Sequence, residues 1–73
     1  MAAVLTTRLT KGGDVLTIRF SPSRERVVKE VSADGRVQAR NGFSGDRFTY
    51  RRQIRSSVKW GWAIESTSEE DLA

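Results

Sequence analysis

The sequence predicts an all-β domain, a small barrel of five to six strands, followed by an acidic tail. Two observations favour this fold: short segments in which apolar and polar residues alternate, and glycine-containing turns between them. A chain of 73 residues has room for one domain with a small core. We therefore expect one β-barrel domain over residues 1–64 and a disordered tail over residues 65–73.

The first two segments predict a β-hairpin. Residues 4–10 and 15–21 have nearly the same pattern. Gly12 and Gly13 lie between them and suit a two-residue type I′ turn, because glycine adopts positive φ angles at little cost. This turn brings three pairs of residues together on one face: Leu9 with Leu16, Thr7 with Ile18, and Leu5 with Phe20.

The middle of the chain allows two interpretations. A helix near 22–33 would begin at a proline and end before a glycine, as helices often do. Its valines instead favour two strands at 27–32 and 36–41, joined by a three-residue loop that places Val31 opposite Val37. We prefer the strands. The helix remains the alternative and would make the domain α+β.

The last third predicts a strand, a helical turn and a final strand. Residues 48–51 contain β-forming aromatic side chains, and residues 52–57 suit a single helical turn. Residues 58–64 alternate, with Val58, Trp60, Trp62 and Ile64 on one face. This order of elements, in which a helical turn precedes the last of several short strands, is typical of SH3-like barrels. An OB-like barrel is the alternative.

Charge is distributed unevenly along the chain. Residues 1–64 contain all 13 Lys and Arg residues and five acids, which gives a charge of +8. Residues 65–73 contain four acids and no base, which gives −4. Ten of the bases are Arg, whose planar fork suits phosphate and carboxylate groups. We therefore expect the basic body to bind a polyanion. The acidic tail can either keep the protein soluble or compete with that polyanion for the basic face, and we favour solubility.

No residue pattern marks an enzyme. The chain has neither His nor Cys, which removes the commonest acid–base catalyst, thiolate chemistry and the usual zinc ligands. It also lacks a Gly-x-Ser-x-Gly elbow and a phosphate-cradling glycine loop. We expect a non-enzymatic protein that binds no cofactor and no metal.

The strongest functional feature is a run of five bases between residues 47 and 59, interleaved with Phe48 and Tyr50. We expect two arginines of the first hairpin to join the same outer surface. Arginines can bind phosphates, and nearby aromatic rings can stack on unpaired bases. The expected phosphate contacts are Arg8, Arg19, Arg47, Arg51, Arg52, Arg55 and Lys59.

Two aromatic residues are candidates for stacking. Phe43 lies in a glycine-flanked loop, where it can be exposed or fold over the open end of the barrel. Trp60 and Trp62 share one face of a strand, and two tryptophans would crowd so small a core. We expect one of them in the core and the other in a groove or an interface. The sequence does not determine which is which, and we name Trp62 as the candidate for stacking.

These observations predict a small protein that binds RNA or DNA mainly through phosphates, with little sequence preference. The alternative is a protein–protein interaction module, an adaptor or small inhibitor, whose basic face meets an acidic partner. A third possibility is a homo-oligomer built by pairing of edge strands. No apolar run is long enough for a secretory signal or a membrane span, so we expect a cytoplasmic protein without membrane contact.

Overall fold

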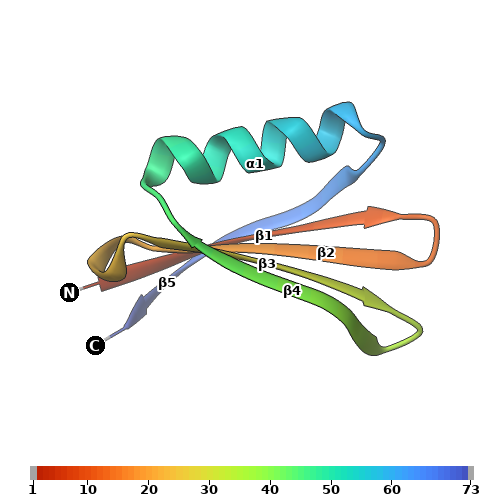
Figure 1. Ribbon diagram of the computed structural model, residues 1–73, viewed down its shortest axis with the longest axis horizontal. Coiled ribbons are helices and arrows are strands. Elements are labelled where there is room, and N and C mark those ends of the chain that lie inside the picture. Colours follow the sequence, from red (N-terminus) through yellow and green to blue (C-terminus); the bar gives the residue numbers. More distant parts are fainter. Residues whose placement is uncertain (1, 73) are drawn as a thin grey trace.

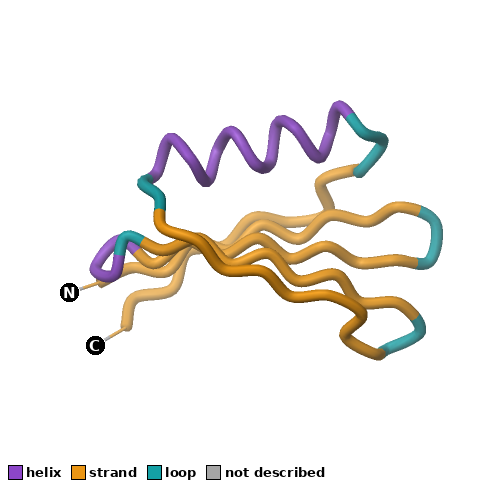
Figure 2. The backbone as a smooth tube through the Cα atoms, in the orientation of Figure 1, coloured by secondary structure: helices purple, strands orange, loops and turns teal. Residues whose placement is uncertain are grey.

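The computed structural model describes the backbone of residues 2–72 and the side chains of residues 4–68. One helix lies across one face of a five-stranded antiparallel sheet, and the opposite face carries no helix (Figures 1 and 2). The elements are, in chain order, β1 Ala2–Lys11, β2 Asp14–Ser21, the 3-10 turn Pro22–Arg24, β3 Arg26–Ala33, β4 Arg36–Ser44, α1 Arg47–Lys59 and β5 Ala63–Leu72.

The sheet is open in the part of the chain that the structure describes. Its strands lie in the order β4-β3-β2-β1-β5, so β4 and β5 form the two edges and do not pair with each other. The expectation of a small β-rich fold is confirmed, whereas closure into an SH3-like or OB-like barrel is not shown. The alternative helix near 22–33 is wrong, because this segment forms a three-residue turn and strand β3.

The predicted first hairpin is confirmed, including its register. All three expected residue pairs of β1 and β2 are cross-strand partners. The turn differs from type I′, because Gly12 has a φ of 61° and Gly13 lies outside the left-handed region. A positive φ at the first turn residue alone fits type II′, which suits a two-residue hairpin equally well.

The β3–β4 hairpin is confirmed as a pair of strands, but the predicted register is wrong. Its loop has two residues, Asp34 and Gly35, whose φ angles of 54° and 75° fit a type I′ turn. The register shifts next to Val31, so this residue pairs with Ala39 and not with Val37. The shorter loop and the irregularity together account for the difference.

Helix α1 replaces the strand expected at 48–51 and the first part of the strand expected at 58–64. Asp46 caps its start, because the carboxylate accepts the Thr49 backbone N–H at 2.9 Å. The Thr49 hydroxyl in turn accepts the Asp46 N–H at 3.4 Å, which completes a capping box. The helix ends before Gly61, whose φ is 102°. The aromatic residues of the first turn suggested a strand, but the cap and the following Arg and Gln residues favour a helix.

Strand β5 corrects the expectation that residues 65–73 are disordered. Its backbone pairs with β1 from Ala2 opposite Leu72 to Thr10 opposite Ala63. The acidic side chains suggested disorder, yet the outer edge of β1 offers backbone N–H and C=O groups that a strand can satisfy whatever its side chains. Residue 73 lies outside the described residues.

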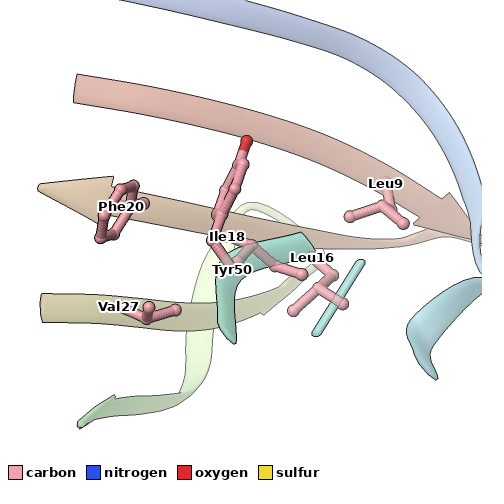
Figure 3. Close-up of a cluster of buried hydrophobic side chains, with 6 residues drawn as sticks. All are labelled: Leu9, Leu16, Ile18, Phe20, Val27 and Tyr50. Carbon is pink, nitrogen blue, oxygen red and sulfur yellow. The ribbon is translucent and has the colours of Figure 1, made fainter. Parts of the chain in front are cut away.

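The core lies between the sheet and α1. Its buried apolar residues are Leu9, Leu16, Ile18, Phe20, Val27 and Tyr50 (Figure 3). The ring of Tyr50 stacks on that of Phe20, with centroids 5.9 Å apart. Its hydroxyl forms a hydrogen bond with the buried hydroxyl of Thr7 in β1, which links the helix to the sheet. Burial raises the pKa of Tyr50, so the phenol stays protonated at neutral pH.

Candidate functional site

The outward face of α1 carries five bases. Tyr50 and Ser57 mark the buried side of the helix, and the bases project from the other side, where all five are exposed. Residues four apart follow one row along a helix, so four of the five form a single row. The helix contains no acid. We call these five residues the helix ridge: Arg47, Arg51, Arg52, Arg55 and Lys59.

Phe48 lies within the helix ridge and is 66% exposed. The guanidinium of Arg52 lies over its ring, 5.0 Å from the centroid, which is a cation–π contact. In the strand expected at 48–51, Phe48 would point away from its neighbours Arg47 and Arg51, because successive strand residues point to opposite faces. A helical period would have shown that Phe48 lies between positions occupied by Arg residues.

The C-terminal end of α1 exposes a second aromatic side chain. Trp60 is 73% exposed, and its backbone carbonyl accepts a hydrogen bond of 2.9 Å from the amine of Lys11. Lys11 thereby adds a base from the β1–β2 hairpin to this end of the helix ridge. Trp62 is half-buried and packs against the core. Trp60 and not the stacking candidate Trp62 is therefore the exposed tryptophan. Helix α1 ends at Lys59 and β5 begins at Ala63, so both tryptophans lie in the connection and do not share one face of a strand.

Phe43 is not in an exposed loop. It belongs to β4, pairs with Val27 and packs against the core while remaining half-buried. The glycines on both sides of it suggested a loop, but the chain stays extended as far as Ser44. Phe43 thus supports the core, which removes it from the stacking candidates.

Arg8 and Arg19 lie on the opposite side of the sheet from the helix ridge. Neighbouring residues of a strand point to opposite faces, and Leu9 and Ile18 are fully buried on the face that α1 covers. The two arginines do not join the helix ridge, contrary to expectation. Arg8 forms an exposed ion pair of 3.3 Å with Glu65, while Arg19 lines a hollow on the helix-free face.

Asp46 is the acid next to the helix ridge in sequence, and its charge is already engaged by the cap. The hydrogen bond from the Thr49 backbone N–H lowers the pKa of this carboxyl below its usual value, and the Thr49 hydroxyl adds to the effect. A carboxylate at a helix N-terminus is also favoured by the helix dipole. Asp46 therefore stabilises the element that carries the bases.

Comparisons with known proteins give no match: no family model, no curated protein and no solved structure resembles this chain. Within residues 2–72, no helix is long and apolar enough to cross a membrane. Nor do three or more acidic side chains gather into a metal-binding group in the part that the structure describes. The candidate site therefore stands on its own geometry.

Proposed function

We propose that this chain binds nucleic acid, RNA or DNA, through phosphate contacts of the helix ridge and with little sequence preference. The observation that carries this proposal is the exposed face of α1, which combines five bases with an exposed Phe48 and no acid. Arginines bind phosphate oxygens through two parallel hydrogen bonds, which makes such a row suited to a polyanion.

The bases of the helix ridge are available for binding. Within residues 4–68, none of them forms an ion pair with an acidic side chain. Each side chain is exposed, so a phosphate contact requires no internal ion pair to be broken first. Release of counterions from the nucleic acid then supplies the main driving force for binding. Phosphate contacts are the same for every base sequence, so they give little sequence preference.

The two exposed aromatic residues favour single strands. Phe48 and Trp60 are twelve positions apart, which is about 18 Å along a helix axis at 1.5 Å per residue. They therefore lie near the two ends of the helix ridge. Every base has a flat face that an aromatic ring can stack on, so such contacts tolerate any sequence. Unpaired bases offer these faces more readily than paired ones do.

The test is the salt dependence of binding to a fluorescent single strand. Five phosphate contacts predict a slope of log K against log salt of about −3.5, since each contact contributes about −0.7 for single strands. Arg51→Gln and Arg55→Gln should each flatten the slope by about 0.7. The matched control is Arg36→Gln, which removes an exposed arginine at the β3–β4 turn, outside the helix ridge.

Two results would contradict the proposal. The first is no binding of the wild-type chain to any nucleic acid at low salt, where phosphate contacts are strongest. The second is a slope that Arg36→Gln flattens as much as the ridge variants do. Salt-insensitive binding to an acidic protein in place of nucleic acid would favour the interaction module.

A further inference from the structure

The helix-free face of the sheet contains a hollow of about 480 Å³. Four arginines line it: Arg19 from β2, Arg24 from the 3-10 turn, Arg26 from β3 and Arg40 from β4. Threonine and serine side chains of β1, β2 and β5 form much of the rest of its wall. None of the described lining side chains is aromatic, in contrast to the helix ridge, where Phe48 is exposed.

The described side chains that line this hollow, those within residues 4–68, are mainly positive in charge. Among the side chains of residues 4–68, Glu30 is the one acid that lines it, and its carboxylate lies 3.9 Å from Nε of Arg40. The other three arginines form no ion pair with any side chain of residues 4–68. Arginine forks and hydroxyl groups are the donors that commonly bind phosphate oxygens. The lining therefore suits a phosphate backbone better than a base or an apolar ligand.

Gly42 helps to place one of these arginines. It pairs with Val28, and a Cβ atom at this position would lie 2.6 Å from Nη2 of Arg26 and 3.2 Å from its Cζ. The guanidinium of Arg26 therefore lies against Gly42 of β4, in space that a larger residue would fill with its side chain. This arrangement holds the charge against the sheet, where it faces the same hollow as Arg19.

The hollow and the helix ridge lie on opposite sides of the molecule. Helix α1 covers one face of the sheet (Figure 1). The bases of the ridge are exposed, while Tyr50 and Ser57 mark the side of the helix that is buried. The arginines of the hollow project from the other face, with the whole sheet between the two surfaces. One straight segment of nucleic acid cannot lie against both surfaces at once.

We infer that the helix-free face is a second phosphate-binding surface and that one molecule bridges two nucleic-acid segments. This inference rests on the proposed function, because the helix ridge must hold the first segment. The consequence is a protein that joins strands or duplexes to one another rather than only coating them. Linking two segments through one rigid domain also raises the effective concentration of each near the other.

The experiment uses beads that carry an immobilised DNA duplex. The full chain is added below saturation at low salt, the beads are washed, and a fluorescent duplex is offered in solution. The amount of protein on the beads reports the first contact, and the captured fluorescence reports bridging. Two double variants have the same net charge: Arg19→Gln with Arg26→Gln removes two charges from the hollow, and Arg51→Gln with Arg55→Gln removes two from the ridge.

We expect wild-type protein to load onto the beads and to capture the second duplex. The amount of the hollow variant on the beads should be within about threefold of wild type, because the ridge contacts stay intact. The captured fluorescence should be about tenfold lower, because charged hydrogen bonds in the hollow are lost. Gly42→Ala keeps every charge but displaces the Arg26 guanidinium, and it should also reduce capture. Sedimentation of each variant shows whether its oligomeric state is that of the wild type.

The outcomes separate the two proposals. Wild-type protein that loads but captures nothing overturns the bridging inference and leaves the proposed function intact. Undiminished capture by the hollow variant also overturns it, since copies joined to one another would then provide the bridge. Loading that depends on the hollow and not on the ridge contradicts the proposed function. Wild-type protein that loads neither onto these beads nor onto beads that carry a single strand contradicts both.

Discussion

The two tryptophans provide a sharp test, because the structure assigns them opposite roles. Trp60 is 73% exposed at the end of α1, whereas Trp62, two residues later, packs against the core. Replacement of each by Ala removes the same side chain from the same short segment. The two variants should therefore differ in what they lose: nucleic-acid binding for Trp60→Ala and stability for Trp62→Ala.

The expected loss at Trp62 follows from its burial. A fully buried aromatic residue covers about 150–250 Å². At about 25 cal/mol per Å², half of that area corresponds to roughly 2–3 kcal/mol. One kcal/mol shifts the melting temperature of a domain of this size by about 4–8 °C, so Trp62→Ala should lower it by roughly 10–20 °C. A small core supplies only about 3–5 kcal/mol in total, so this variant should be close to unfolding.

Trp60→Ala should leave the free energy of unfolding within about 0.5 kcal/mol of wild type, as exposed substitutions usually do. If its indole stacks on a base, binding of a single strand should weaken by about 1–3 kcal/mol, or roughly 5- to 150-fold. Thermal unfolding followed by circular dichroism and titration of a labelled single strand measure the two effects. The reasoning is refuted if Trp60→Ala destabilises the fold more than Trp62→Ala does.

Two further predictions concern the docking and the capping of α1. Tyr50→Phe removes the hydrogen bond to the Thr7 hydroxyl and should cost about 1 kcal/mol, or about 4–8 °C in melting temperature, with little change in binding; an unchanged melting temperature would show that this bond contributes nothing. The Asp46 carboxyl has a lowered pKa in the folded state, so its stabilising effect is complete above its unfolded pKa of about 3.9 and declines as pH falls through the lower folded value. Urea unfolding at a series of pH values should therefore show a smaller acid-induced loss for Asp46→Asn, whose side-chain oxygen still caps the helix; equal losses in both proteins would argue against this role.

The first four strands could be predicted because their signals are local. Alternation of apolar residues and a two-residue glycine turn determine which residues of β1 and β2 are partners, and Leu9 opposite Leu16 follows directly from them. The register of β3 and β4 could not be predicted in the same way. An irregularity beside Val31 shifts the pairing by one residue, and no residue type in the sequence marks its position.

Helix α1 and strand β5 were missed because their stability comes from elsewhere in the chain. The residues Phe48-Thr49-Tyr50 favour a strand by propensity, but the cap at Asp46 and the contacts of Tyr50 with the core hold them in a helix. Strand β5 forms against the edge of β1 although its side chains are polar. The bases of the candidate site were recognised from the sequence, while their division between two surfaces required the positions of β2 and α1.

The pairing of β1 with β5 has a consequence for the order of folding. Ala2 lies opposite Leu72, so these strands close the longest loop in the described chain, while the other pairings join neighbouring hairpin strands. Loop closure becomes more costly with length, and non-local pairings slow folding. The four-strand meander should therefore assemble first, with α1 and β5 added last. The two ends of the chain lie at the same end of the sheet (Figure 1). A circular permutant that joins them by a short turn and opens the chain at Gly12-Gly13 would make β1–β5 a local hairpin and transfer the longest loop closure to β1–β2.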